Sequence, residues 1–396
     1  MRAGVGAVLG AMLIAGCGAG GPGRGGGGVH DAKPPLNAAQ SQAVIAVAPG
    51  DGAKDVPTGG ALAVTVGSGT LTEVVAKSAD GVPVPGAVSA DARSWHPSGS
   101  LALGTQYTVD AYAVDALGRP AAKHAVFTTL VPAHALIGFF SPENGSTVGT
   151  AMIISLRFSH PVAARAAVER GVTVTADPAV PVVGHWFGDQ RLDLRPRLFW
   201  APGTQVTLRL RLRGVEGSPG IRGTQWKDVH FSIGRDQRST VDAAAHTMTV
   251  RRDGDVLRVL PVSTGVPGHA TYNGIMVIAE KFTLTRMNSH TVGFGAEYDI
   301  PDVPHAMRLT RSGTFVHGNY WSSPDVFGRT DVSHGCIGLR DTKGGGAATP
   351  AGWFFAHSLV GDPIRVIGSH ERTVAADNGM SGWNLSWDDW TAGSSL

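Results

Sequence analysis

The residues best suited to covalent chemistry in this chain are one cysteine and two histidines that lie close together in the sequence. Cys336 directly follows His334 and Gly335, and His317 lies a short segment earlier. A thiolate is a strong nucleophile, and an imidazole partner increases the thiolate population at neutral pH. Gly335 lets a substrate carbonyl approach the backbone closely, where the amides of Gly335 and Cys336 could form an oxyanion hole. The segment therefore predicts a cysteine nucleophile for acyl transfer.

Local chemistry leaves two other roles open for this cysteine. An isolated cysteine is often a small buried hydrophobic residue without reactivity. His317, His334 and Cys336 could instead bind zinc, but a fourth ligand or a water would be needed, and their spacing matches no common zinc template. The nucleophile is the favoured hypothesis, and it requires neither a metal nor a cofactor.

The elements that must position these residues are predicted to form a mostly β unit over 237–368. Strand-forming residues there are separated by glycine-rich connections. We expect strands over 247–250, 256–260, 274–278 and 362–367 and a short helix over 352–359. The chemistry-bearing residues fall between the third of these strands and the helix.

The tail of the chain, 369–396, carries three tryptophans, Trp383, Trp387 and Trp390. Their spacing puts the three rings on one side of a turn if the segment is helical. Three exposed indoles would be costly, so we expect the tail to form a C-terminal subdomain that packs back onto the third unit. A role in binding a partner or a sugar is the less favoured alternative.

The chain before this unit is predicted to hold two tandem immunoglobulin-like β-sandwiches, over 43–130 and 131–236. The sequence GTQYTV at 104–109 returns as GTQVTL at 203–208, an offset of 99 residues, close to the length of one sandwich of about 100 residues. Acidic residues and histidines are scattered in both modules without motif spacing, so we expect spacers or binding platforms. The whole chain is expected to be a multidomain protein dominated by β-structure.

Residues 1–17 have the pattern of a bacterial lipoprotein signal peptide. Arg2 precedes an apolar run that is too short to span a bilayer, and small residues lead to Cys17. We expect Cys17 to be lipidated and 18–42, which is rich in glycine and proline, to be a flexible linker. The folded part would then be extracytoplasmic, held at the cell membrane by the lipid alone, in the cell wall or periplasmic space. An ordinary signal peptide with an incidental cysteine is the alternative.

Composition excludes several classes of protein. Hydrophobic residues make up 42% of the 396 residues, which excludes wholesale disorder. There are 33 Lys and Arg against 31 Asp and Glu, so a net charge of +2 gives no basic excess for nucleic-acid binding. Cys17 and Cys336 are the two cysteines, which is too few for a disulfide scaffold.

The segment from His317 to Cys336 resembles the signature of the L,D-transpeptidase catalytic domain. In that family a histidine is followed, after a spacer of this length, by Ser/Thr-His-Gly-Cys; here fifteen residues separate His317 from Ser333. The resemblance extends over about 240–396. The lipoprotein signal and the tandem immunoglobulin-like modules resemble the layout of mycobacterial and related actinobacterial members. The resemblance implies a β-rich catalytic fold of its own type.

The resemblance also implies roles for individual residues. Cys336 is the nucleophile, His317 is the base that activates it, and the backbone carbonyl of Gly318 orients the imidazole. The oxyanion region and the substrate groove are implied for Ser333, His334, Gly335, Tyr298, Trp321 and Met287. Among these, Tyr298 and Met287 depend most on where gaps are placed in the alignment.

One residue departs from the family pattern. The family usually has Asn or Arg two residues after the cysteine, where this chain has Gly338. Glycine supplies no side-chain donor. Either a neighbour such as Asn319 supplies the hydrogen-bond donor instead, or this protein binds the donor stem peptide differently.

By resemblance, the reaction is a two-step acyl transfer that builds 3→3 cross-links between peptidoglycan stems during cell-wall biogenesis. Cys336 attacks a donor tetrapeptide, and the side-chain amine of an acceptor's diamino acid resolves the thioester. Inactivation by carbapenem β-lactams is a further implication. The alternatives are an L,D-carboxypeptidase that releases D-Ala from tetrapeptide stems and a non-catalytic wall-binding lipoprotein.

Overall fold

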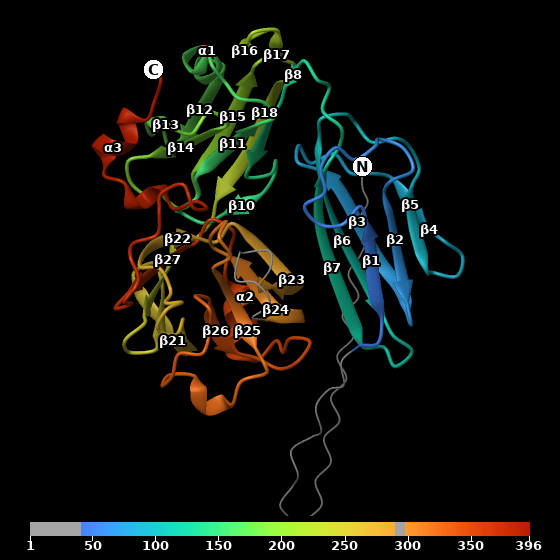
Figure 1. The fold of residues 1–396 in the computed structure, drawn as a ribbon, viewed down its shortest axis with the longest axis vertical. Helices are drawn as coiled ribbons and strands as arrows, with labels where there is room; N and C mark the ends of the chain where they lie inside the picture. The colour runs from blue at the N-terminus through green and yellow to red at the C-terminus, as the bar shows by residue number, and fades with distance from the viewer. Residues whose placement is uncertain (1–40, 290–297) are drawn as a thin grey trace, which may run out of the picture. The chain divides into compact units, whose positions relative to one another are not determined.

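The computed structural model describes residues 41–289 and 298–396, and strands predominate throughout these ranges (Figure 1). The predicted β-dominated, multidomain fold class is confirmed. The signal peptide, Cys17 and nearly all of the predicted linker lie outside the described residues. No helix in the described ranges has the length and apolar character needed to cross a membrane.

The first module is a sandwich of two antiparallel sheets. One sheet has the order β1 (Val44–Ala48), β2 (Ala63–Gly67), β5 (Ser94–Pro97), β4 (Gly86–Val88), and the other β3 (Thr70–Ser78), β6 (Gln106–Val114), β7 (Pro120–Thr128). Inward-facing residues of both sheets form its core, in which Tyr107 and Phe127 stack with ring centroids 5.6 Å apart beside the buried Trp95. Alternation along each strand therefore places one apolar face inside the sandwich.

The second module also has two main sheets. One has the order β10 (Thr147–Val148), β18 (Trp226–Ile233), β15 (Gln205–Arg211), β12 (Val172–Asp177), and the other β13 (Val182–Phe187), β14 (Arg191–Pro196), β11 (Ile154–Phe158), β9 (Gly138–Ser141). Three short strands, β16 (Glu216–Ser218), β17 (Ile221–Gly223) and β8 (Ala135–Leu136), pair separately, and one helix, α1 (Arg165–Arg170), precedes β12. Their apolar faces meet in a core that includes Leu208 and Phe158.

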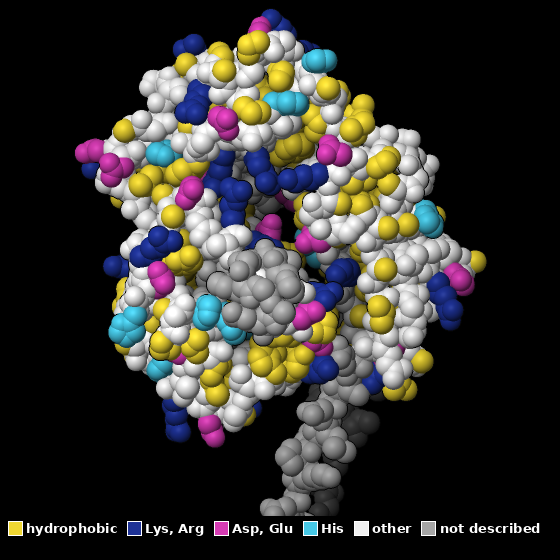
Figure 2. Space-filling view, in the orientation of Figure 1, with side chains coloured by type: hydrophobic (Ala, Val, Ile, Leu, Met, Phe, Trp, Pro, Cys, Tyr) yellow, Lys and Arg dark blue, Asp and Glu magenta, His cyan; other side chains and the backbone are white. Residues whose placement is uncertain are grey.

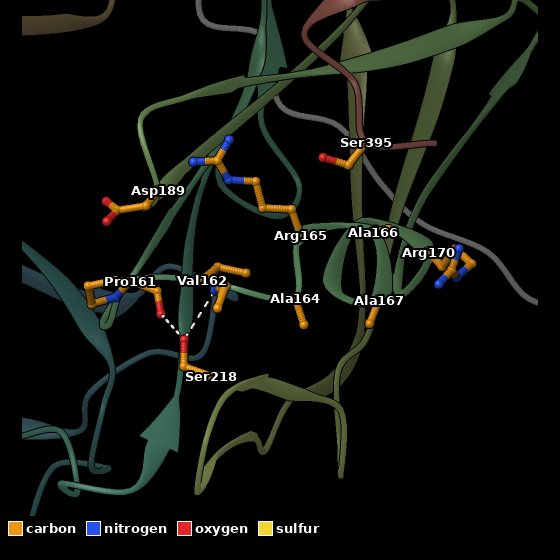
Figure 3. A pocket seen from close by; sticks show the side chains of 11 residues that line it. Pro161, Val162, Ala164, Arg165, Ala166, Ala167, Arg170, Asp189, Ser218 and Ser395 are labelled. Atoms are coloured by element: carbon orange, nitrogen blue, oxygen red, sulfur yellow. Dashed lines mark hydrogen bonds between the residues drawn. The ribbon is translucent and has the colours of Figure 1, made fainter.

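Two hollows lie outside the strands that carry His317 and Cys336. An open one of about 790 Å³ surrounds α1 on the second module and is lined by Arg165, Asp189 and Ser395 (Figure 3). Lys and Arg side chains gather around the hollow at the centre of Figure 2. A hollow of about 640 Å³ is lined by charges of both signs, among them Arg157, Arg311, Glu143 and Glu280.

The third unit is built on a nine-stranded sheet within the described residues. The sheet order is β22 (Gly274–Val277), β27 (Pro363–Ile367), β19 (Gln237–Asp242), β20 (Thr247–Arg252), β21 (Asp255–Ser263), β26 (Ile337–Arg340), β25 (Phe315–Asn319), β24 (Asp299–Arg308), β23 (Glu280–Asn288). A helix, α2 (Pro350–His357), contributes the buried Phe354 to the core of this sheet, and a 3-10 turn, η2 (Pro324–Val326), follows β25. The predicted strands and helix of this unit all fall on observed elements of the same type.

The tail contains a 3-10 turn, η3 (Gly382–Asn384), and one short helix, α3 (Trp387–Ala392). The prediction that its tryptophans pack onto the third unit is wrong. Trp390 is fully buried and its indole N–H donates to the carbonyl of Val183 at 3.0 Å, while Trp383 donates to the carbonyl of Ala151 at 2.8 Å. Both partners belong to the second module.

The physical reason lies at an open sheet edge of the second module. Strand β13 is the outer strand of its sheet, and Trp390 covers its exposed side. The guanidinium of Arg195 lies over the rings of Trp383, Trp387 and Trp390, at 4.5, 5.4 and 4.3 Å from their centroids. A partly desolvated cation between three indoles gains cation–π energy that an apolar surface alone would not offer. The part of the tail before η3 does contact the third unit: Val374 belongs to that unit's core, and the side chain of Asn273 donates to the carbonyls of Ser369 and Glu371. Asn384 adds side-chain bonds to the backbone of Ile275.

Candidate active site

Two adjacent parallel strands bring the predicted residues together. Strand β25 carries His317, and β26 begins directly after Cys336. The register pairs Val316 with Ile337 and His317 with Gly338. Apolar residues at these positions are buried in the sheet's core, which holds both strands in place. The imidazole and the thiol therefore project from neighbouring strands.

The turn before β26 is shaped by Ser333 and Gly335. The Ser333 hydroxyl donates to the carbonyl of Cys336 at 2.6 Å and accepts from the amide of Gly335 at 3.2 Å. Gly335 has φ +106°, a conformation that L side chains rarely adopt. The Ser-His-Gly-Cys order therefore has a local structural reason. The serine hydroxyl closes the turn with hydrogen bonds, and the glycine can adopt the backbone conformation that the turn needs.

The backbone of the next residue orients the imidazole of His317. The ring's Nδ1 lies 2.9 Å from the carbonyl oxygen of Gly318. A carbonyl only accepts, so Nδ1 carries the proton and Nε2 has a free lone pair. The ring also stacks on Trp321 at 5.6 Å between centroids and 12° between planes. Burial lowers the pKa of His317, opposed by its bond to Gly318 and by the negative charge of Asp341. The ring is therefore a neutral base at physiological pH.

Cys336 lies in an apolar cluster and is 8% exposed. Its thiol donates to the carbonyl of Gly313 at a distance of 3.5 Å between sulfur and oxygen. Burial raises the pKa of this thiol to about 11, although a backbone bond at Phe315 and the charge of Arg308 act in the other direction. In this conformation the described residues include no hydrogen bond between the thiol and His317. The raised pKa and the bond to the Gly313 carbonyl both favour the protonated thiol in this conformation.

The remaining predicted residues surround this pair. Met287 belongs to the apolar cluster around Cys336, and Tyr298 packs against the same cluster. The Tyr298 ring lies 5.2 Å from that of His334. Trp321, which is 42% exposed, presents its indole to solvent beside the imidazole of His317. The structure thus places the residues from β23 and from the start of β24 next to the cysteine.

Asn319 lies where a side chain at position 338 would point. A Cβ atom on Gly338 would be 3.7 Å from Nδ2 of Asn319. That amide nitrogen donates to the Ser322 hydroxyl at 3.0 Å, and the amide oxygen accepts from the Ser322 backbone at 3.0 Å. Asn319 is 4% exposed. Asn319 therefore fills the space next to Gly338, but its amide is largely committed to Ser322.

Sequence reasoning missed two residues of the site. His269 lies in the turn after β21, and its ring is 5.1 Å from that of His334. Asp341 follows β26 directly, and its carboxylate packs against the backbone of Gly318. Neither stands at a motif position, because each reaches the site through tertiary contacts. Over the ranges that the structure describes, no cluster of His, Cys, Asp and Glu has the arrangement of a metal site.

Comparison with known proteins places this site in a family. Residues 236–366 match the L,D-transpeptidase catalytic domain, and residues 53–216 match a bacterial Ig domain. The chain is 32% identical over 348 residues to L,D-transpeptidase 2 of Mycobacterium tuberculosis, covering 87% of this chain and 83% of that protein. It is 31% identical over 355 residues to L,D-transpeptidase 5 of the same species, covering 88% of this chain and 76% of that protein.

A solved L,D-transpeptidase in complex with imipenem is 30% identical to this chain, covers 60% of it and 100% of its own length, and superposes with a TM-score of 0.49. The chain belongs to the L,D-transpeptidase family. It is a cysteine-dependent transpeptidase with an N-terminal bacterial Ig region and a β-rich catalytic domain. The third unit is called the catalytic domain from here on.

Proposed function

We propose that this enzyme forms 3→3 cross-links between peptidoglycan stem peptides in the cell wall, with Cys336 as nucleophile and His317 as base. The observation that carries the proposal is the orientation of His317. Its Nδ1–H is held by the Gly318 carbonyl at 2.9 Å, so Nε2 is the atom left to take a proton. The turn that presents Cys336 lies on the adjacent strand.

The first step acylates the enzyme. As the sulfur of Cys336 attacks the carbonyl between the diamino acid and D-Ala of a tetrapeptide stem, its proton passes to Nε2 of His317. A bond from carbon to sulfur forms, and the carbonyl oxygen becomes an oxyanion near the backbone amides of the turn, Tyr298 and His334. The bond from carbon to nitrogen then breaks, and the imidazolium returns the proton to the D-Ala amine. Because burial raises the pKa of the thiol to about 11, the base His317 is needed to remove its proton.

The second step transfers the acyl group. The side-chain amine of an acceptor's diamino acid attacks the thioester, and His317 takes a proton from that amine. The bond from carbon to sulfur breaks, an amide forms, and the thiolate regains its proton. The apolar neighbours of Cys336, among them Phe282, Met287 and Phe315, favour this outcome over hydrolysis because they limit water at the thioester.

The test is incubation of the purified full-length protein with a disaccharide-tetrapeptide, followed by mass spectrometry. We expect a cross-linked dimer, released D-Ala and an acylated Cys336, and none of these with Cys336→Ala. Tripeptide without dimer would instead support the L,D-carboxypeptidase. An unchanged cross-link content in cells carrying Cys336→Ala would support a non-catalytic wall-binding protein.

We also propose inactivation by carbapenems. The strained β-lactam carbonyl is an acyl donor for the same thiol: a bond from carbon to sulfur forms, the ring C–N bond breaks, and the freed nitrogen stays tethered to the acyl group, where it hinders attack by an acceptor amine on the thioester. One covalent adduct on the peptide that contains Cys336, absent in Cys336→Ala, is the expected mass-spectrometric result. A protein that keeps its transpeptidase activity at full occupancy of that adduct would contradict the proposal.

The last proposal concerns location. The lipoprotein pattern that ends at Cys17 supports an enzyme held outside the cytoplasm by a lipid on that residue. Radiolabelled fatty acid should label the wild-type protein in cells and not Cys17→Ser, which should appear in the medium or the soluble wall fraction. Equal membrane retention of both forms would contradict lipid anchoring.

A further inference from the structure

A buried carboxylate lies directly behind the backbone that orients the catalytic histidine. The side chain of Asp341 is fully buried. A Cβ atom placed on Gly318 would lie 2.2 Å from Oδ2 of Asp341 and 2.9 Å from its Cγ. The carboxylate therefore occupies the space that a side chain at position 318 would take. The Asp341 backbone amide donates to the carbonyl of Asn319 at 3.2 Å, which ties the residue to the end of the strand that carries His317.

Hydrogen bonds fix the position of this carboxylate. Oδ1 accepts from the amides of Thr342 and Gly346 at 2.8 and 2.9 Å and from the Thr349 hydroxyl at 2.9 Å. Oδ2 lies 2.7 Å from Nδ1 of His305 on β24. Asp341 is thus held in a fixed position, with the peptide of Gly318 between its carboxylate and the imidazole.

We infer that Asp341 is a positioning residue for the transpeptidation proposed above: its negative charge stabilises the imidazolium that His317 forms when it takes the proton of Cys336. The inference rests on that proposed function. Burial opposes both charged forms of the pair, since it lowers the pKa of His317 and raises that of Cys336. The charge of Asp341 works against this penalty at His317. Its place resembles that of the carboxylate in a Ser-His-Asp triad, but one peptide unit is interposed.

The other titratable groups near Asp341 and His317 come from the elements that pack against these two residues. His305 and Asp302 lie on β24, Tyr320 follows β25, and Lys343 follows Asp341 in the same loop. The Tyr320 hydroxyl donates to Asp302 at 2.5 Å, and Lys343 lies 3.8 Å from the same carboxylate. On α2, His357 is bonded to the Trp353 carbonyl at 2.7 Å. His305 is therefore the group in direct contact with Asp341 whose protonation would offset its charge.

The test uses Asp341→Asn in the full-length protein. The amide oxygen of Asn can accept the three bonds that Oδ1 accepts, and its NH₂ can face His305 as a donor, so shape and hydrogen bonding are kept while the charge is lost. The readout is the rate of carbapenem adduct formation on the Cys336 peptide between pH 5 and pH 9. We expect a rate about tenfold lower at pH 7 and an acid limb that moves to lower pH, because a neighbouring negative charge raises the pKa of a histidine.

Asp362→Asn is the matched control. Asp362 is another buried carboxylate of the same domain, but its partner is Arg235. This variant should lower the unfolding midpoint and leave the position of the acid limb unchanged. If Asp341→Asn lowers the midpoint and leaves both rate and limb unchanged, Asp341 is structural and the inference is overturned.

Two substitutions at His305 test the same charge without altering Asp341. His305→Asn keeps a neutral donor and should retain the wild-type rate, whereas His305→Lys places a permanent positive charge against the carboxylate and should slow adduct formation about tenfold. Equal rates for the two variants overturn the inference even if Asp341→Asn does not fold. Absence of any adduct on the wild-type enzyme would contradict the proposed function, so the two failures are distinguishable.

Discussion

At the scale of single residues, Gly318 shows how a missing side chain serves the site. Its carbonyl orients His317, and its Cα faces the carboxylate of Asp341. Glycine is needed here because the Asp341 carboxylate lies too close to the backbone to leave room for a side chain, and not because the backbone has a positive φ. The family resemblance assigned the carbonyl a role, but the reason for glycine at this position came from Asp341, which follows a different strand.

We predict that Gly318→Ala reduces the rate of cross-linking by at least about tenfold, because a group forced 2.2 Å from a carboxylate oxygen must displace either Asp341 or the carbonyl that holds His317. Gly338→Ala is the matched control. Its Cβ would meet no atom closer than 3.6 Å, so activity should stay within about twofold of wild type. Equal activities of the two variants would show that the position of the Gly318 carbonyl does not matter.

The protonation state of Cys336 gives a second prediction. A thiol whose pKa is about 11 is neutral at pH 7, and its thiolate fraction rises with pH up to that value. Alkylation of Cys336 by iodoacetamide should therefore rise by about tenfold per pH unit from pH 7 to 9.5 without a plateau, whereas the same peptide in urea levels off near pH 8.5. Mass spectrometry of the Cys336 peptide provides the rates. A plateau below pH 8 in the folded enzyme would mean a resting thiolate paired with His317.

At the scale of elements, parallel pairing of β25 with β26 is what converts a sequence motif into a site. The fifteen residues between His317 and Ser333 include η2 and leave the sheet and return to it. The length of the spacer matters because a parallel pair needs a crossover connection. Short spacing within the Ser-His-Gly-Cys turn, by contrast, reflects local hydrogen bonds of Ser333.

The helix of the tail gives the prediction at this scale. Trp390→Ala should lower the unfolding midpoint by an amount that corresponds to about 3–5 kcal/mol, because a fully buried indole, its bond to Val183 and its contact with Arg195 are all lost. Trp387→Ala is the control, since that ring is only partly buried and should cost less. Thermal unfolding followed by circular dichroism measures both. Equal midpoints for the two variants would contradict the packing described.

At the scale of the whole molecule, the second module and the catalytic domain are joined by direct backbone bonds. The amide of Gly149 donates to the carbonyl of Val360 at 2.7 Å, and that of Ala151 donates to Gly361 at 3.0 Å. Arg235, in the segment between the two units, forms two bonds with the Asp362 carboxylate at 2.8 and 2.6 Å. These contacts and the tail that contacts both units couple the stabilities of the module and the domain.

We predict that Arg235→Ala separates the unfolding of these two parts. The variant leaves the carboxylate of Asp362 buried without its partner, a change that costs about 3–5 kcal/mol. Calorimetry should show a shared transition in the wild type and an additional, lower transition in the variant. Arg251→Ala serves as control, because that arginine is exposed and bonds the Gly254 carbonyl within its own hairpin. A single unshifted transition for Arg235→Ala would contradict the coupling.

Much of the architecture could be predicted from the sequence alone. The β-dominated class, the strands of the catalytic domain and the pair His317 and Cys336 depend on local propensity, turn chemistry and a spaced motif. Met287 and Tyr298 were also predicted, through the resemblance, and the structure places both beside the cysteine. Such features are predictable because they are determined by neighbours in the chain or by a pattern that the family shares.

What the tertiary structure decided depends on residues far apart in the chain. It places the tail's indoles around Arg195, it brings Asp341 and His305 behind Gly318, and it buries Cys336, which raises the pKa of the thiol. Desolvation and through-space charge depend on which atoms surround a group, and no local pattern encodes that neighbourhood. The motif alone therefore predicted which residues react, while the fold decides which groups surround them and in which direction their pKa values shift.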